Sequence, residues 1–192
     1  LRNRFIKSGA NEAMCLDGRP TRALLQHHSE LARGGVGMTT VAYMAVAPEG
    51  RTLPNQIWMR PDILPDLQTL TAAAHAGGAA ISAQITHGGS FVTGMKVKGR
   101  TISSSGGFNP AGMLKGNFLQ RAMNAADMER VTAEFVAAAR LARDAGFDAV
   151  ELHMGHGYLL NQFISPLSNR RQAEYGGSPE NRRRFVLEVV DA

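Results

Sequence analysis

Two histidines and a tyrosine lie close together at the end of a predicted strand. The apolar run 147–153 predicts a short buried strand, and His153, His156 and Tyr158 stand at its end or on the turn that follows. Side chains that donate or exchange protons, placed past the carboxyl end of a strand, are typical of a catalytic site. This turn is therefore the first candidate for the chemistry of the chain.

The histidine pair has three interpretations from residue chemistry alone. His153 and His156 could donate two N–H groups to one oxygen, which polarises a carbonyl and stabilises the charge that forms as an adjacent double bond accepts a hydride. They could instead bind zinc, with Glu151 or His87 as a third ligand. They could also be structural histidines bonded to backbone groups. Tyr158, with an ordinary pKa of about 10, is either a proton donor to carbon or a buried phenol with a backbone partner.

Strands alternate with helices along the whole chain. Strands are predicted at 4–10, 36–42, 79–85 and 147–153, and helices from about 21 to 34, 62 to 77, 124 to 146 and from 178 onward. Such alternation predicts a parallel sheet, either a (β/α)8 barrel or an open doubly wound sheet. No G-x-G-x-x-G follows the first strand, which argues against a dinucleotide-binding Rossmann unit. The Gly/Ser-rich stretch 88–117 predicts a long functional loop with a small hairpin.

Composition excludes several classes of protein. The chain has 192 residues and a net charge of +5, enough for one globular domain with a sizeable core. Its basic residues are scattered, and the cluster 182–184 fits a solvated helix face, so we expect no nucleic-acid partner. No apolar run is long enough to cross a bilayer, and we expect no membrane partner. The single Cys15 fits a reducing compartment, so we expect a cytoplasmic location.

Several motifs together resemble one known family. They are Gln84-Ile-Thr-His87-Gly, the run from His153-x-x-His156-Gly-Tyr158 to Ser165-Pro166, and Tyr175-Gly-Gly-Ser-x-Glu-Asn-Arg182. These motifs, with shorter ones from Arg2 onward, are similar to those of the old yellow enzyme family of FMN-dependent oxidoreductases and ene-reductases. The resemblance covers essentially the whole chain.

The resemblance implies an α/β fold of the TIM (β/α)8 barrel type, with about the first four βα units in this chain. Residues 1–192 would be the N-terminal part of a single FMN-binding barrel domain. The implied activity takes hydride from NADH or NADPH onto FMN and passes it to an activated alkene, such as an enone, a nitroalkene or an enoyl or dienoyl compound. We also expect the full-length protein to be a homo-oligomer.

The resemblance also implies a role for each site residue. His153 and His156 would hold the substrate oxygen, and Tyr158 would donate the proton. The residues implied to contact FMN are Ser8, Gly9, Ala10, Asn11, Tyr43 and Gln84. Two of them depart from the family pattern, because Asn11 stands where Cys or Thr is frequent and Tyr43 stands where many members have Gly or Ala.

Two other functions stay open at this level. The chain could be an incomplete, non-catalytic half-barrel that needs a partner, since four strands are half of a closed barrel. It could also be a metal-dependent lyase on the same fold. The ligands of that lyase would be His87, Glu151, His153 and His156.

Overall fold

The computed structural model describes residues 1–92, 101–114 and 116–192. The chain divides into two compact units. The first unit consists of Leu1–Val46, Pro54–Ile85 and Ala137–Leu152, and the second of Ala47–Leu53, Thr86–Val136 and His153–Ala192. That residues 1–192 belong to a single barrel domain therefore stays a prediction.

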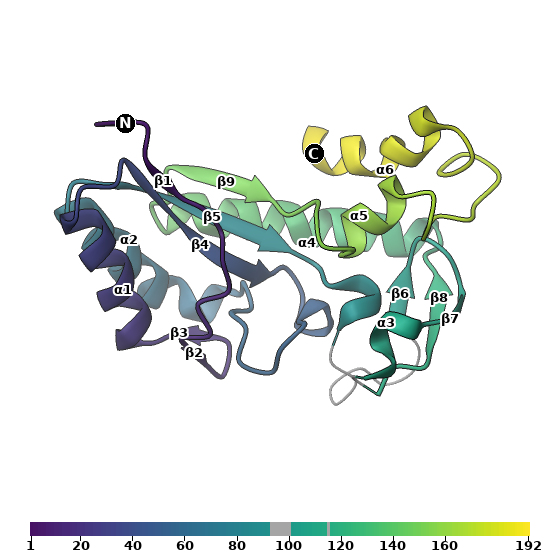
Figure 1. Cartoon of the computed structure of the whole chain (residues 1–192), viewed down its shortest axis with the longest axis horizontal. Helices are drawn as coiled ribbons and strands as arrows, with labels where there is room; N and C mark the ends of the chain where they lie inside the picture. The colour runs from purple at the N-terminus through teal and green to yellow at the C-terminus, as the bar shows by residue number, and fades with distance from the viewer. Residues whose placement is uncertain (93–100, 115) are drawn as a thin grey trace. The chain divides into compact units, whose positions relative to one another are not determined.

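The first unit is built on a sheet of four strands. These are β1 (Ile6–Lys7), β4 (Met38–Ala45), β5 (Ala80–Thr86) and β9 (Ala149–Leu152), in the order β1-β4-β5-β9 (Figure 1). The β1–β4 and β5–β9 pairs are parallel. Neighbouring strands follow their order along the chain, as in a barrel wall, whereas a doubly wound sheet reverses its order at a switch point. Strand order thus decides between the two folds that the sequence left open.

Two predicted strands differ from those observed. The strand predicted at 4–10 contains only Ile6 and Lys7, since only these two residues pair with β4. The prediction that the fourth strand is buried is wrong, because the Val150 side chain is 40% exposed. β9 is an edge strand of this sheet and pairs only with β5 among the described strands, so one long side of it has no neighbour.

Two helices of the first unit pack against each other along the sheet (Figure 1). α1 (Arg22–Arg33) buries Leu24, His28 and Ala32 on one face, which is the four-residue spacing of an amphipathic helix. α2 (Leu64–Ala76) follows the short turn η2 (Pro61–Ile63). A two-stranded hairpin, β2 (Cys15–Leu16) and β3 (Arg19–Pro20), precedes α1 and was not predicted.

The second unit contains a small three-stranded sheet. β6 (Thr101–Ser103) pairs in parallel with β8 (Leu119–Ala122), and β7 (Gly107–Phe108) pairs with β8 in antiparallel fashion. Two short turns, η1 (Pro48–Gly50) and η3 (Gly89–Phe91), and the helix α3 (Pro110–Met113) belong to the same unit. The loop predicted at 88–117 therefore holds more structure than one hairpin, although its residues 93–100 and 115 lie outside the described residues.

The remaining helices begin as their capping residues predict. At the start of α4 (Ala125–Asp144), the Asn124 N–H donates to Asp127 Oδ2 and the Asp127 N–H donates to Asn124 Oδ1, both at 2.9 Å. This reciprocal pair is a capping box. α6 (Pro179–Asp191) begins after Ser178, whose hydroxyl accepts the Asn181 N–H.

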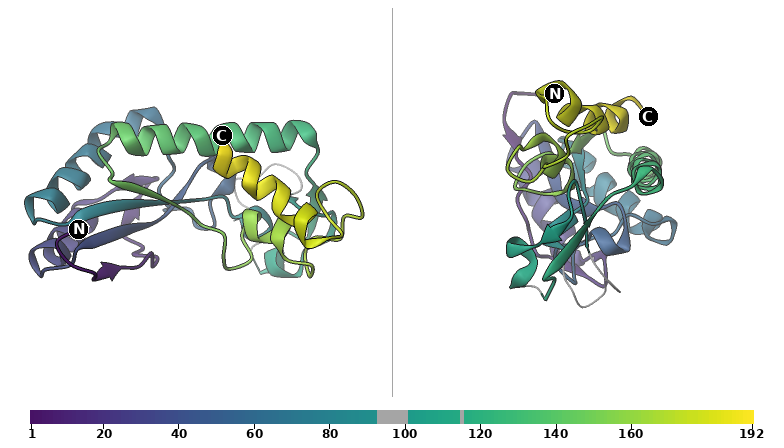
Figure 2. Two further views of the ribbon diagram at one scale, coloured as in Figure 1. Left: turned by 90° about the horizontal axis from the view of Figure 1, so that it is seen from above. Right: turned by 90° about the vertical axis from the view of Figure 1, so that its right-hand side faces the viewer.

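α5 (Leu159–Ile164) is short and follows the histidine turn. It lies beside α6 (Figure 2), and the rings of Phe163 and Phe185 are 4.6 Å apart between them. Both rings are fully buried, so this contact holds the second unit's helices together. Among the described residues, no helix has the length and apolarity needed to span a membrane.

Candidate active site

The carboxyl end of β1 brings its backbone against a buried carboxamide. A Cβ atom added at Gly9 would lie 2.4 Å from Gln84 Nε2, so any larger residue there would displace the Gln84 carboxamide. Ser8, Ala10 and Asn11 are exposed around it. The structure therefore brings together the segment 8–11 and Gln84, which were predicted to share one site.

Gln84 is fixed across the sheet. Its side chain is buried, and Nε2 donates to Glu151 Oε1 at 2.7 Å. The two residues face each other in the β5–β9 register. Tyr43 is buried in β4, and its carbonyl accepts a hydrogen bond from Gln56 Nε2 at 2.8 Å. A held carboxamide with a second N–H and a carbonyl oxygen suits the edge of a planar heterocycle.

A partly buried ion pair braces the same strand end. Lys7 Nζ bonds to Glu12 Oε1 and donates to the Thr40 carbonyl at 2.9 Å, while Glu12 Oε2 accepts the Ala42 N–H. The Glu12 side chain is only 5% exposed. Because Lys7 and Glu12 flank residues 8–11, their bond closes that segment into a fixed loop. Sequence reasoning missed this pair, although a Lys and a Glu five residues apart around a Gly-Ala strand end are a usable signal.

Beneath this brace lies a fully buried histidine. His28 Nδ1 is 2.7 Å from the Thr39 hydroxyl oxygen. Burial, with smaller contributions from Lys7 and His27, lowers the pKa of His28 to about 3. The ring is therefore neutral at pH 7 and supports the loop by packing and hydrogen bonding rather than by charge.

In the second unit, the histidine turn has an unusual backbone. His156 has φ +56° and Gly157 has φ +74°, two consecutive residues in the left-handed region that side chains generally avoid. Hydrogen bonds hold the turn, because the Gly157 N–H donates to Asn161 Oδ1 at 3.0 Å and the Leu159 N–H donates to the His87 carbonyl at 2.9 Å. Backbone outside the common regions persists where surrounding contacts fix it, and this is frequent at functional sites.

The three predicted side chains of this turn are in contact. His153 Nε2 and His156 Nδ1 are 3.0 Å apart, and the Tyr158 ring centroid is 4.9 Å from that of His153. His153 Nδ1 accepts the Gly155 N–H, so a neutral His153 carries its proton on Nε2 and donates it to His156. The rings are thus bonded to each other rather than offering two separate donors, and an oxygen held by both must enter between these two nitrogens.

Gln162 ties the turn to its surroundings and was missed by sequence reasoning. It is buried on α5, its Nε2 donates to the Gly157 carbonyl at 2.5 Å, and its Oε1 accepts the Ser103 hydroxyl at 2.9 Å. These bonds link the turn to β6. Its place in the motif that follows Tyr158 was visible in the sequence, but its partners were not.

A pocket adjoins this turn. Its volume is about 560 Å³, and its lining includes Phe91, Gly157, Asn161, Gln162 and Arg170. The Phe91 ring also packs edge-on to Tyr158, with centroids 5.9 Å apart. A pocket of this size accommodates a small organic molecule.

The residues predicted as ligands of a metal-dependent lyase do not form one cluster in the described part of the chain. Within the described residues, the group of three or more side chains that could hold a metal ion is Glu49, His87 and Glu134. Of the predicted ligands His87, Glu151, His153 and His156, only His87 belongs to it. The geometry of the turn therefore gives no support to a lyase centred on the histidine pair.

Comparisons with known proteins identify the family of the chain. The sequence model of the NADH:flavin oxidoreductase / NADH oxidase family matches residues 1–192. The chain is 41% identical over 194 residues to the 4,4'-dithiodibutanoate disulfide reductase of Rhodococcus erythropolis, covering 100% of the chain and 47% of that protein. It is 39% identical to the NADPH dehydrogenase of Geobacillus thermodenitrificans, covering 100% of the chain and 55% of that protein.

Two solved structures are similar to the chain in fold. Old Yellow Enzyme from Pichia sp. superposes with a TM-score of 0.91 at 29% identity, covering 100% of the chain and 52% of that structure. Morphinone reductase in complex with tetrahydroNAD gives a TM-score of 0.88 at 26% identity, covering 98% of the chain and 55% of that structure. The chain spans about half the length of these relatives.

The four strands of the first unit are part of a TIM barrel of the flavin-linked oxidoreductase type. The chain belongs to the NADH:flavin oxidoreductase / NADH oxidase family, whose cofactors are FMN and NADH or NADPH.

Proposed function

We propose that the full-length protein is an NAD(P)H-dependent FMN oxidoreductase that reduces activated alkenes, meaning enones, nitroalkenes or enoyl and dienoyl compounds. The observation that carries this proposal is the contact of His153, His156 and Tyr158 on one strained turn. Family membership and the pocket beside the turn support it. Bound FMN supplies the hydride that it receives from NAD(P)H.

The residues of the first unit fit a planar cofactor. The close approach of Gly9 to Gln84 leaves a strand end without side-chain bulk, and Gln84 is held by Glu151. We assign flavin contacts to the backbone of residues 8–11, to the carboxamide of Gln84 and to Tyr43. The Lys7–Glu12 pair keeps the 8–11 loop in place for this contact.

The residues of the turn act on the substrate. His153 Nε2 and His156 Nδ1 lie 3.0 Å apart. A carbonyl or nitro oxygen inserted between them accepts the His153 Nε2–H, and it accepts an N–H from His156 once the proton of that ring moves to Nδ1. This stabilises the negative charge that develops on that oxygen as hydride reaches the β-carbon. Tyr158 then donates its phenolic proton to the α-carbon, which completes the two-electron reduction. The adjoining pocket receives the rest of the substrate.

A ligand-binding experiment tests the clamp. Phenols carry an oxygen that two N–H donors can hold, and no reaction follows. His153→Ala combined with His156→Ala should weaken phenol binding to the full-length enzyme by 10-fold or more while FMN stays bound. Unchanged phenol affinity in this variant would remove the proposed role.

Flavin binding has its own test. Gly9→Ala places a methyl group against Gln84 and should lower FMN affinity about 10-fold. Gly37→Ala is the matched control, because its Cβ would meet the Asn3 carbonyl oxygen at 2.5 Å in the same unit, outside residues 8–11. Equal FMN affinity in the two variants contradicts the assignment, and a protein that binds no FMN contradicts the proposed function as a whole.

One relative suggests a second substrate class. The 41% identical protein from Rhodococcus erythropolis is named as a reductase of an organic disulfide. Reduction of a disulfide also takes a hydride and a proton, and yields two thiols. NADPH consumption with an enone and with a small dialkyl disulfide, measured side by side, decides which class the enzyme prefers. The homo-oligomeric state and the cytoplasmic location stay predictions.

A further inference from the structure

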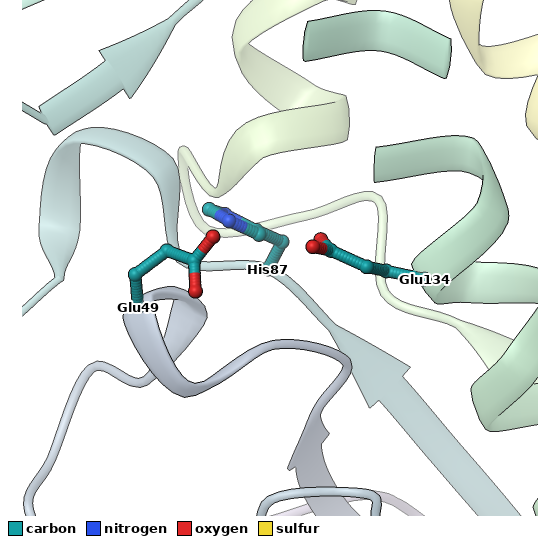
Figure 3. A group of neighbouring side chains, drawn as sticks. All are labelled: Glu49, His87 and Glu134. Atoms are coloured by element: carbon teal, nitrogen blue, oxygen red, sulfur yellow. The ribbon is translucent and has the colours of Figure 1, made fainter. Parts of the chain in front are cut away.

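Three side chains that the proposed function does not use converge in the second unit. Glu49 lies on η1, His87 follows the end of β5, and Glu134 lies on α4. Figure 3 shows the three side chains turned toward one another from these separate segments. One ligand atom from each lies within 4.8 Å of the other two. The cluster therefore joins segments that are 38 to 85 residues apart in the sequence.

Two atoms of this cluster are buried without hydrogen-bond partners among the described residues. His87 is 2% exposed, and its Nε2 atom has no partner. Glu134 Oε2 is also buried and unpartnered. Buried polar groups are almost always satisfied, so two such atoms in one cluster point to a ligand that both can bind. A metal cation can bind both an imidazole nitrogen and a carboxylate oxygen.

Arg130 sets the orientation of the two carboxylates. Its Nη1 donates to Glu49 Oε1 at 2.7 Å and to Glu134 Oε1 at 2.5 Å. The second oxygen of each carboxylate is left for another interaction. The charges of Glu49, Glu134 and Arg130 sum to −1 when both carboxylates are ionised. The two carboxylates attract a cation, and the guanidinium of Arg130, which is bonded to both, opposes its binding by charge repulsion.

One hydrogen bond opposes cation binding and limits its strength. The Gly89 N–H donates to His87 Nδ1 at 3.1 Å, so the neutral ring carries its proton on Nε2. A cation at Nε2 requires that proton to move to Nδ1, and the Gly89 N–H must then find another acceptor. Zinc lies about 2.0–2.2 Å from nitrogen and oxygen ligands, so the ligand atoms must also draw together slightly. We therefore expect micromolar rather than nanomolar affinity.

We propose that Glu49, His87 and Glu134 bind one divalent transition-metal ion such as Zn²⁺ or Co²⁺, with water completing the coordination. An imidazole with two carboxylates favours these ions over Mg²⁺ and Ca²⁺, which prefer oxygen ligands alone. The ion links three segments: η1, His87 just after the end of β5, and α4. It stabilises the folded state, because the unfolded chain does not bring these ligands together. The site is structural and takes no part in the proposed reduction.

Calorimetric titration of the chelator-treated full-length protein with Zn²⁺ tests the proposal. One Zn²⁺ should bind with micromolar affinity, and Mg²⁺ should give no binding at the same concentrations. Glu134→Gln should weaken Zn²⁺ binding at least 10-fold. The matched control is Glu129→Gln, an exposed acid on the same helix, which should bind as the unaltered protein does. Glu49→Gln, a half-buried position, repeats the test if Glu134→Gln does not fold.

Two further variants distinguish this site from other zinc ligands. The histidine pair of the turn is the main competitor, so the protein with His153→Ala and His156→Ala should keep its Zn²⁺ affinity. Arg130→Gln removes a positive charge beside the ion and should tighten binding several-fold. The proposal is overturned if neither the unaltered protein nor Arg130→Gln binds Zn²⁺, if Glu134→Gln and Glu129→Gln bind it equally, or if binding disappears with the turn histidines.

Discussion

The candidate residues of the first unit and those of the second unit are held in different ways. At the strand ends of the first unit, the functional surface is mostly backbone, and its position is fixed by a partly buried ion pair and a cross-strand carboxamide bond. At the turn of the second unit, the functional groups are side chains that bond to one another and rest on a strained backbone. A planar cofactor needs a rigid binding surface. Proton transfer and the binding of a substrate oxygen need side chains that can exchange hydrogen-bond partners. The predictions below test this contrast.

The largest effect is expected at the turn. Tyr158→Phe removes the proposed proton donor and should lower the rate of alkene reduction about 1000-fold, within the range for a general acid. Stopped-flow measurement of flavin reoxidation by the alkene reports this step. Flavin reduction by NAD(P)H serves as the control and should not change. An unaltered reoxidation rate means that another group, or water, donates the proton.

A smaller effect is expected at the brace of the first unit. Glu12→Gln leaves the Lys7 ammonium half-buried without its partner, which should lower the free energy of unfolding by about 3 kcal/mol. Urea unfolding measures this loss. Glu30→Gln, an exposed acid on α1, should change stability by less than about 0.5 kcal/mol. If the two variants are equally stable, the ion pair does not fix the 8–11 loop.

Two buried neutral histidines, His28 in the first unit and His87 in the second, make stability depend on pH. Burial lowers the pKa of both His28 and His87 to about 3, against about 6.5 in an unfolded chain. Between these values the unfolded state binds more protons, so stability is complete above pH 6.5 and is lost as the pH falls toward 3. From pH 7 to pH 5 we expect a loss of about 2 kcal/mol for each histidine.

Urea unfolding at pH 7, 6 and 5, with EDTA present, checks this dependence. His28→Asn and His87→Asn should each reduce the loss between pH 7 and pH 5 by about 2 kcal/mol, whatever they do to stability at pH 7. A pH dependence as steep as that of the unaltered protein in either variant shows that its histidine is not the group responsible.

The smallest effect concerns a helix end in the second unit. Ser178 accepts the Asn181 N–H at the start of α6, so Ser178→Ala should lower the free energy of unfolding by about 1 kcal/mol. Ser178→Asp keeps an acceptor at this position and should restore the stability. Thermal or urea unfolding of the two variants measures the difference. Equal stability of both would show that the Ser178 cap does not stabilise α6.

Much of the fold was predictable because its signals are local. The capping box at Asn124 and Asp127 and the cap at Ser178 act over three residues, and the structure confirms both. The order of the strands does not follow from these signals, because alternating strands and helices fit both a barrel and a doubly wound sheet. The exposure of Val150 was not predictable, because burial of a strand depends on what lies beside it rather than on its own apolar residues.

The site was predictable in its members but less so in its geometry. The residue types and spacing at the turn predicted that His153, His156 and Tyr158 lie together, and they do. Their mutual hydrogen bond depends on the left-handed backbone at His156, which has no reliable sequence signal. The Glu12 brace and the convergence of Glu49 on His87 and Glu134 join segments that only the folded chain brings together.

The positive φ at His156 limits which residues evolution or engineering can place there. Asn, Asp and Gly tolerate this conformation, whereas β-branched and bulky residues do not. Of these, Asn keeps an N–H donor near the position of the imidazole. A library that randomises position 156 to change substrate preference should therefore return mainly His and Asn among active clones, while position 153, which has no such restriction, accepts a wider choice.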